Sequence, residues 1–292
     1  MEARTTVFAS LRPSLFSIAY RMLGSVMDAE DLVQDAYLRW QEASEADVRS
    51  PRAYLATIVT RLAINHLRSA RVKRETYVGP WLPEPLVTDR THDASDSVEL
   101  AESLSMAFLV LLERLSPIER AVFLLREVFD FEYSEIARIV DKGEANTRQL
   151  LARAKKRISE SRPRFEADQA RADRLVDRFT QASLGGDMDG LLAILAEDVT
   201  LWADGGGKAR GAALKPVHGA SAVARFVLGI MRRIVPPDAI VRPTVINGQS
   251  GFIVYADGRP LATQIFDIRD ERIHTIYAIA NPDKLHTLPA AP

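Results

Sequence analysis

A stretch near the middle of the chain carries side chains that could read DNA. Its spacing predicts a short helix over residues 135–140, a turn over 141–143 and a longer helix from 144. One face of the longer helix would present amide, guanidinium and ammonium groups: Asn146, Arg148, Gln149, Arg153 and Lys156. Forked donors on a helix suit the base edges of a major groove, so the pattern favours a helix-turn-helix. An ordinary amphipathic helix with a solvated basic face fits the same spacing.

The helices that must position this face can be predicted from the flanking sequence. A buried stripe is expected from the helical recurrence of Leu150, Leu151, Ala154 and Ile158. Upstream, an N-cap serine and an N1 proline, Ser116-Pro117, predict a helix over 117–129. Another helix is predicted over 98–115. Residues 98–163 therefore predict an all-helical domain.

The first 75 residues predict a second all-helical domain. Helices are expected over 7–23, 28–42 and 51–74, the middle one with Asp28 as its N-cap. The middle helix would expose a stripe made of Asp31, Gln34, Asp35 and Leu38. The third helix would expose a stripe made of Thr57, Arg61, Asn65 and Arg68. Solvated surfaces often carry such stripes, so the spacing alone assigns them no partner.

Residues 76–97 break the helical pattern. Three prolines within residues 79–85 remove backbone donors and fix φ, so this segment is expected to be extended. A solvated linker has little use for Trp81 and Leu82, and we expect both side chains to dock on another part of the chain.

After residue 163 the pattern changes to helices followed by strands. Helices are predicted over 171–183, 187–196 and 220–234. Period-two alternation predicts strands over 199–203, 239–246, 252–256, 261–268 and 272–279. Hairpin turns are predicted at Asn247-Gly248, Asp257-Gly258 and Asp270-Glu271. The layout is α+β with an antiparallel meander.

Composition limits the classes of function. With 292 residues the chain has room for two or three domains, and 26% charged residues is ordinary for a soluble protein. The absence of Cys excludes disulfides, cysteine-ligated zinc and thiol chemistry. No apolar run could span a membrane and residues 1–12 lack a secretory pattern, so we expect a cytoplasmic protein without a membrane partner.

The net charge of −1 is unusual for a protein that binds free DNA, but the charges are unevenly distributed. Residues 153–164 hold six bases and one acid, and residues 68–74 hold four bases and no acid. Residues 75–102, in contrast, hold seven acids and one base. Since the acids offset phosphate attraction, we expect weak binding to free DNA. A larger partner that places the chain on DNA would overcome this weakness.

These segments resemble the extracytoplasmic-function sigma factors of bacteria. Residues 15–40 and 52–68 are similar to sigma region two, and residues 115–129 with the helix-turn-helix are similar to sigma region four. The remainder resembles a SnoaL-like, nuclear-transport-factor-type domain, which one subgroup carries together with three short motifs. All three occur here: W-L-P-E-P at 81–85, D-G-G-G-K at 204–208 and N-P-D-K-L at 281–285. One departure is Lys142, where an apolar residue is usual, and the turn glycine is displaced to Gly143.

The resemblance implies a sigma region-two domain at 1–75, an acidic linker at 76–97, a sigma region-four domain at 98–163 and a SnoaL-like cone with a curved antiparallel sheet at 164–292. It also implies a function: the chain would bind core RNA polymerase, recognise two elements of promoter DNA and start transcription. No enzymatic activity, cofactor or metal is expected.

The resemblance assigns roles to the exposed stripes. The polymerase would be bound by Asp31, Gln34, Asp35 and Leu38. The downstream promoter element, read as separated single strand, would be contacted by Arg61, Asn65 and Arg68. Trp40 or Tyr54 could stack a base there or could belong to the core. The upstream element, read as duplex, would be contacted by Asn146, Arg148, Gln149, Arg153 and Lys156. Of the bases on this helix, Lys155, Lys156 and Arg157 would hold the DNA backbone.

The third domain is implied to regulate the other two through the three motifs. The residues concerned are Trp81, Leu82, Pro83, Glu84, Pro85, Asp204, Gly205, Gly206, Gly207, Lys208, Asn281, Pro282 and Asp283. A small-molecule ligand or a separate anti-sigma protein stays open as a further partner. Two alternatives remain: a ligand-responsive helix-turn-helix regulator that works without polymerase, and a SnoaL-type enzyme with a DNA-binding appendage. The enzyme would need an acid–base pair, for which Asp204, His218 and His274 are the candidates.

Overall fold

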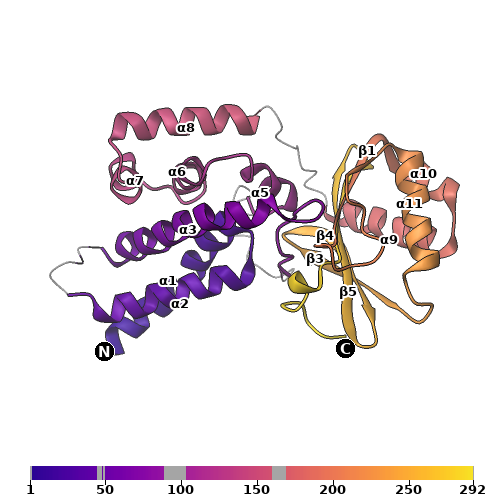
Figure 1. Cartoon of the computed structure of the whole chain (residues 1–292), viewed down its shortest axis with the longest axis horizontal. Coiled ribbons are helices and arrows are strands. Elements are labelled where there is room, and N and C mark those ends of the chain that lie inside the picture. Colours follow the sequence, from indigo (N-terminus) through magenta and orange to yellow (C-terminus); the bar gives the residue numbers. More distant parts are fainter. Residues whose placement is uncertain (1, 45–47, 49, 89–102, 160–168, 292) are drawn as a thin grey trace. The chain divides into compact units, whose positions relative to one another are not determined.

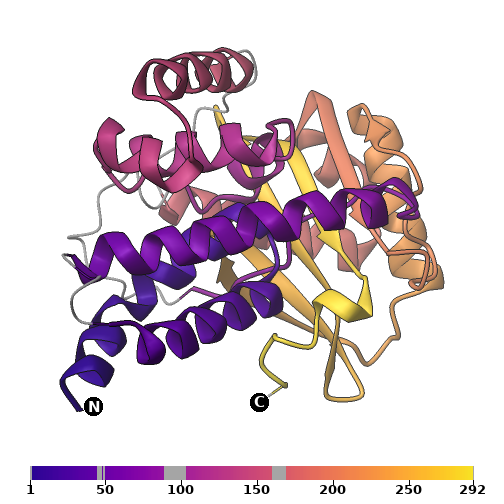
Figure 2. The ribbon, with the colours of Figure 1, turned by 60° about the vertical axis from the view of Figure 1, so that its left-hand side comes forward.

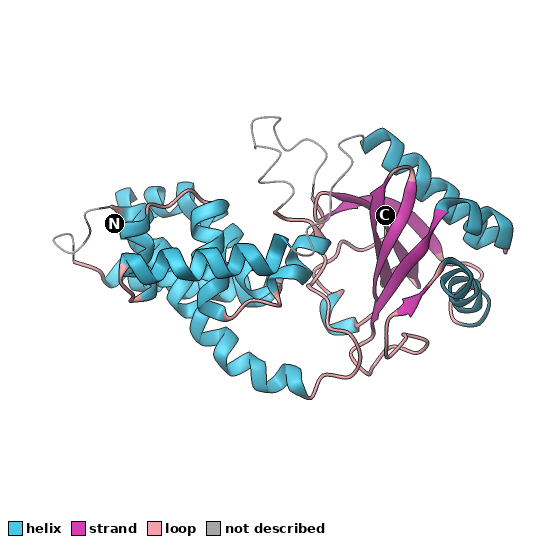
Figure 3. Cartoon of the chain, turned by 90° about the horizontal axis from the view of Figure 1, so that it is seen from above, coloured by secondary structure: helices cyan, strands magenta, loops and turns pink. Residues whose placement is uncertain are grey.

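The structure, a computed structural model, describes residues 2–44, 48, 50–88, 103–159 and 169–291 (Figure 1). These residues form two compact units, Met1–Glu75 with Phe108–Arg162 and Thr76–Ala107 with Pro163–Pro292. The elements of the first unit are helices, and all the described strands belong to the second (Figure 3). The predicted helix start at 98, most acids of the linker and the bases at 162 and 164 lie outside the described residues.

Three helices from the N-terminal part pack against one another in the first unit (Figure 2): α1 (Glu2–Leu23), α2 (Val26–Glu42) and α3 (Pro51–Glu75). Gly24 ends α1 with a φ of 66°, a conformation that favours glycine. The N-cap of α2 is Ser25 and not Asp28, because Ser25 Oγ accepts a hydrogen bond from the Asp28 N–H at 3.2 Å. Asp28 is instead the third residue of the helix, where its carboxylate interacts favourably with the positive end of the helix dipole.

The same unit contains α6 (Pro117–Glu127), α7 (Tyr133–Val140) and α8 (Glu144–Ser159), and α5 (Met106–Leu112) leads into it. Ser116 is the N-cap of α6 and Pro117 its first residue, as predicted, and Ser116 also forms a capping box with Glu119. The predicted helix over 98–115 is shorter in the structure, since its described part extends only from Met106 to Leu112. Asp141 ends α7 in the left-handed conformation with a φ of 54°, so the turn does not require a glycine at that position.

The second unit contains α9 (Gln169–Gly185), α10 (Met188–Ile194), β1 (Leu195–Asp204), β2 (Val217–His218), α11 (Ala220–Arg233), β3 (Ile240–Ile246), β4 (Gln249–Ala256), β5 (Arg259–Arg269), β6 (Arg272–Ile279) and the 3-10 turn η2 (Pro282–Lys284). The strand order is β2-β1-β6-β5-β4-β3. Neighbours from β3 to β6 are antiparallel as predicted, but β1 pairs in parallel with β6. The sheet is therefore mixed. A parallel pair needs a long connection in place of a hairpin, and the chain between β1 and the meander supplies one.

Three tight hairpins set the register of the meander. Both central residues of each turn have positive φ: Asn247 and Gly248, Asp257 and Gly258, Asp270 and Glu271. This is the conformation of type I′ turns, whose twist matches that of the flanking strands. The predicted turn positions are therefore confirmed.

One face of the sheet is covered by α9, α10 and α11 (Figure 1). Phe179 of α9 lies at the centre of this core, with its ring centroid 5.0 Å from that of Phe266 and 6.4 Å from that of Phe252. Val223 and Val227 of α11 are buried in the same cluster. Helices on one face of a six-stranded mixed sheet give an α+β domain, the fold class predicted for this part of the chain.

Candidate functional site

The predicted DNA-reading face of α8 is exposed in the structure. Its five residues all have solvent-accessible side chains: Asn146, Arg148, Gln149, Arg153 and Lys156. The opposite side of α8 is fixed by Leu151, Ala154 and Ile158, which are buried as the periodicity predicted. Leu150 is half-buried, and Thr147 is completely buried.

Other parts of the unit hold α8 and one of its predicted DNA-reading side chains in place. The Arg148 guanidinium lies 4.0 Å from the centroid of the Tyr133 ring and 3.5 Å from Glu144. Lys155 and Arg157 each pair at 2.7 Å with an acid of α6, Glu127 and Glu119 respectively. The side chains implied to hold DNA backbone therefore also attach α8 to α6.

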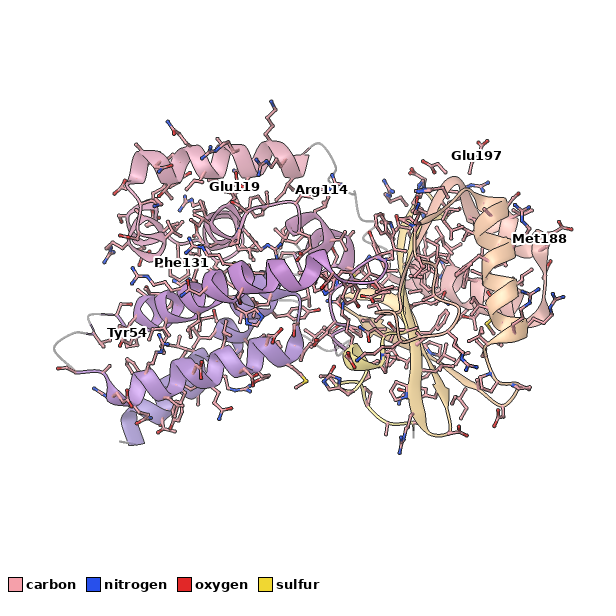
Figure 4. The ribbon with its side chains drawn as sticks, viewed as in Figure 1. Tyr54, Arg114, Glu119, Phe131, Met188 and Glu197 are labelled. Atoms are coloured by element: carbon pink, nitrogen blue, oxygen red, sulfur yellow. The ribbon has the colours of Figure 1, made fainter. Side chains whose placement is uncertain are left out.

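Glu119, labelled on α6 in Figure 4, joins the helix cap to α8. Its carboxylate accepts hydrogen bonds from the Ser116 backbone N–H at 3.0 Å and from Arg157 at 2.7 Å. Burial alone would raise the pKa of Glu119, but these donors outweigh it and lower the pKa below its ordinary value. The ionised carboxylate is therefore part of the folded structure of this unit.

The predicted stripe on α2 is also exposed. Asp31, Gln34 and Asp35 face solvent, and the neighbouring Leu38 side chain is 56% exposed. The other face of α2 is buried, and its Trp40 lies with its ring centroid 6.0 Å from that of Tyr54. Trp40 also donates a hydrogen bond to the carbonyl of Arg4 at 3.1 Å, so it belongs to the core and is not presented to a base.

The stripe on α3 is exposed, but one of its residues is already engaged. Asn65 and Arg68 face solvent. Arg61 donates from Nε to the Ile139 carbonyl at 2.9 Å and from Nη2 to the Arg138 carbonyl at 2.8 Å. These carbonyls belong to the last turn of α7, where helices lack internal donors. No local signal could have revealed this bond, because its partners lie far apart in the sequence.

Two further arginines attach the N-terminal helices to the helices after residue 107. Arg52 donates to the Phe129 carbonyl at 2.9 Å, and its guanidinium lies 4.5 Å from the centroid of the Phe131 ring, labelled in Figure 4. Arg120 is buried and donates to the Met22 carbonyl at 2.6 Å. In this arrangement α3 packs on α6 and α7.

In the second unit the three short motifs meet around one buried carboxylate, that of Asp204. It accepts hydrogen bonds from the Tyr77 hydroxyl, from the Leu82 N–H at 2.8 Å and from Lys284 Nζ at 2.7 Å. It also accepts from the Gly206 N–H at 3.1 Å. The linker residues Tyr77 and Leu82 are thus bonded to the end of β1.

The cation and the amide beside this carboxylate complete the contact with the linker. Lys284 Nζ also donates to the Leu82 carbonyl and lies 4.2 Å from the centroid of the Trp81 ring. Asn281 donates to the Tyr77 hydroxyl oxygen at 2.8 Å. We call these five residues the clasp: Tyr77, Leu82, Asp204, Asn281 and Lys284.

The environment of the clasp restricts its residues. Burial, and then the Asp204 carboxylate, raise the pKa of Tyr77 above its ordinary value, so its hydroxyl stays a donor. A Cβ atom on Gly206 would lie 2.4 Å from Asn281 Nδ2, which explains a glycine there. Lys208 and Asp283 form a second, exposed ion pair at 2.5 Å.

The linker is held on both sides of the residues that the structure does not describe. Before them, Leu86 exchanges two hydrogen bonds with Asn247, and the Thr88 N–H donates to the Val245 carbonyl at 3.0 Å. After them, Asn247 Nδ2 donates to the Leu104 carbonyl at 3.1 Å, and the Met106 N–H donates to Gln249 Oε1 at 2.8 Å. Lys284 belongs to the predicted N-P-D-K-L motif, but its contact with Asp204 was not predicted. Asn247 was predicted only as a turn residue, and Gln249 was not predicted as a site residue. The docking expected of Trp81 and Leu82 is confirmed.

The three candidates for acid–base chemistry have other partners. Asp204 is the centre of the clasp, and His218 Nδ1 lies 3.2 Å from Thr200 Oγ1. His274 lies 3.6 Å from Asp198, which is exposed. Within the described part of the chain, no group of His, Cys, Asp and Glu could hold a metal ion, and no helix is long and apolar enough to cross a membrane.

Comparisons with known proteins agree with this geometry. Residues 7–72 match the family Sigma-70 region 2, and residues 105–158 match the family Sigma-70, region 4. The ECF RNA polymerase sigma factor SigJ of Mycobacterium tuberculosis is 39% identical over 291 residues, which cover 95% of this chain and 91% of that protein. The probable ECF RNA polymerase sigma factor SigI of the same species is 30% identical over 286 residues, covering 96% and 93%. The crystal structure of SigJ from this species matches with a TM-score of 0.76 and 36% identity, covering 96% of this chain and 97% of that chain. The chain therefore belongs to the extracytoplasmic-function (ECF) sigma factors of RNA polymerase.

Proposed function

We propose that the C-terminal domain of this sigma factor modulates transcription by holding the linker between the two promoter-reading regions. As an ECF sigma factor, the chain binds core RNA polymerase and promoter DNA and starts transcription; it is not an enzyme. We infer that it works in the cytoplasm, where polymerase and promoters are found. The clasp is the single observation that carries the proposal, because it bonds the linker to a domain that sigma regions two and four do not include.

The length of the linker explains why holding it would matter. The segment Thr76–Ala107 connects the two stretches of the first unit. Fully extended, it could span about 110 Å at ~3.4 Å per residue. Hydrogen bonds at residues 77–88 and at 104–106 attach both of its sides to the C-terminal domain, which removes most of that reach. Release of the linker would let region two and region four separate to contact two promoter elements.

The exposed stripes supply the proposed contact surfaces. The polymerase would bind the α2 stripe, where carboxylates surround one apolar anchor: Asp31, Gln34, Asp35 and Leu38. Such a stripe gives orientation and register more than affinity. The downstream element would be contacted by Asn65 and Arg68 of α3, and the upstream element by the exposed face of α8, from Asn146 to Lys156.

Arg61 supports a further step in this scheme. Two of its five N–H donors are bonded to α7 carbonyls, so it could turn its whole guanidinium to single-stranded promoter DNA if α3 separated from α7. We therefore propose that the arrangement seen here is a closed form, and that binding to core polymerase opens it.

Transcription in vitro with purified core polymerase and the full chain tests the role of the clasp. Leu82→Asp would place a second carboxylate beside Asp204 and is expected to release the linker and change transcript yield several-fold. Thr76→Asp adds the same charge at an exposed position of the same segment and should leave the yield close to wild type. A chain ending at residue 163 should reproduce the effect of Leu82→Asp. Equal yields from all four proteins would contradict the proposal.

A further inference from the structure

The C-terminal domain encloses a cavity of about 440 Å³ between its helices and its sheet. The walls come from α9, α11 and the strands β1, β4, β5 and β6. Aromatic and aliphatic side chains dominate the lining: Phe179, Phe226, Ile230, Met231, Phe252 and Val254. This volume and this lining are those of a small-molecule site.

Two polar atoms in the lining have no protein partner. Gln264 Oε1 and Ser183 Oγ are both buried, and no hydrogen bond reaches either of them from the described residues. Gln264 pairs with Phe252 on one neighbouring strand and with Ala278 on the other, and all three line the cavity. Directly paired residues share a face of the sheet, so the amide belongs to the cavity wall. A buried polar atom without a partner is unfavourable unless another molecule satisfies it.

The charges of the lining lie where the cavity meets solvent. Among the described lining residues, only Lys208 and Arg210 are charged, and both side chains are exposed. The Lys208 ammonium is paired with Asp283. The interior is therefore uncharged and mostly apolar, with one unpartnered amide oxygen and one unpartnered hydroxyl group.

We propose that this cavity binds a neutral, mostly apolar molecule that carries a hydroxyl group, and that the hydroxyl bonds to Gln264 and Ser183. A hydroxyl group both donates and accepts, so it satisfies a carboxamide and a serine together. An anion or a cation would lose its hydration among aromatic side chains without a charged partner. The inference concerns binding alone and does not depend on the role proposed for the clasp.

Two fluorescent probes of nearly equal shape test the proposal on the full chain. 1-Hydroxypyrene carries the hydroxyl group, and 1-methylpyrene carries a methyl group in its place. Saturable binding of one 1-hydroxypyrene per chain is expected, with an affinity about tenfold above that of 1-methylpyrene, the value of one buried hydrogen bond. 1-Pyrenecarboxylate should bind more weakly than 1-hydroxypyrene at neutral pH.

Gln264→Leu is the decisive variant, because leucine has a similar volume and cannot form the bond. Its preference for 1-hydroxypyrene over 1-methylpyrene should be smaller than that of wild type, because Ser183 alone remains to bond the hydroxyl. Its melting temperature should not decrease, since an unpartnered amide oxygen has been removed. Ala278→Leu, which fills the space beside Gln264, should weaken the binding of both neutral probes. The proposal is overturned if neither neutral probe binds, if the carboxylate binds most tightly, or if Gln264→Leu keeps the full wild-type preference for the hydroxyl probe.

Discussion

The ammonium group of Lys284 lies 2.7 Å from the carboxylate of Asp204, and these side chains are only 8% and 0% exposed. A second lysine and aspartate from the same two motifs, Lys208 and Asp283, pair at 2.5 Å with side chains that are 57% and 60% exposed. The chain thus offers a buried and an exposed ion pair of the same chemistry a few residues apart. They should differ strongly in their effect on stability, because only the buried carboxylate loses its compensation when its partner is removed.

Lys284→Met should destabilise the second unit by about 3–5 kcal/mol, the usual effect of leaving a buried charge unpaired. Lys208→Met is the matched control and should change the free energy of unfolding by less than about 1 kcal/mol. Urea unfolding followed by circular dichroism measures both values. Similar losses in the two variants would mean that Asp204 is solvated and that the clasp does not depend on it.

Arg153→Ala should reduce discrimination between the cognate promoter and a variant of its upstream element by about 1–3 kcal/mol, if Arg153 is bidentate to a base. Arg148→Ala should do the same, with an added loss from its contacts to Tyr133 and Glu144. Arg225→Ala, on the exposed surface of α11, is the control and should have no effect. Footprints of the reconstituted polymerase on both promoters measure the ratio of its affinities for the cognate and the variant promoter. If both α8 variants give wild-type footprints, this helix face does not take part in promoter recognition.

The lowered pKa of Glu119 predicts how the stability of the first unit changes at acid pH. Its pKa is lowered in the folded protein, so it stabilises the fold above the ordinary carboxyl pKa of 4.5, and this contribution is lost as pH falls through the lower folded value. Glu119→Gln should therefore be less stable than wild type by about 1.5–3 kcal/mol at pH 7, the range for hydrogen bonds to a charged group. Urea unfolding at a series of pH values should show this difference shrinking below pH 4.5. A difference that is constant with pH would show that the ionised carboxylate has no role.

Local features of this chain were predictable because short-range chemistry determines them. The Ser116-Pro117 cap, the three hairpin turns and the buried stripe of α8 all depend on residues within one or two turns of each other. The predicted N-cap of α2 was wrong because Ser and Asp both favour the N-cap position. The helix begins at the earlier candidate, Ser25, directly after Gly24, the glycine of positive φ that ends α1.

Long-range pairing was not predictable from the sequence. The parallel alignment of β1 with β6 joins strands separated by α11 and the meander, and no periodicity encodes it. The contacts of Arg61 with α7 and of Asn247 with the linker have the same character. The motifs contain both Asp204 and Lys284, but nothing in the sequence shows that these two side chains form a buried pair.

The closed arrangement of the first unit gives a final prediction, and the absence of Cys makes it straightforward to measure. Ser10→Cys on α1 and Ala152→Cys on α8 place labels at exposed positions on the two parts of that unit. If core polymerase separates α3 from α7 and so breaks the bonds of Arg61 to the α7 carbonyls, energy transfer between the labels should fall when polymerase is added. A second pair, Ser10→Cys with Arg39→Cys, lies on two helices of the N-terminal bundle and should report no change. If transfer between positions 10 and 152 is equally high with and without polymerase, the unit does not open, and the proposal of a closed form is wrong.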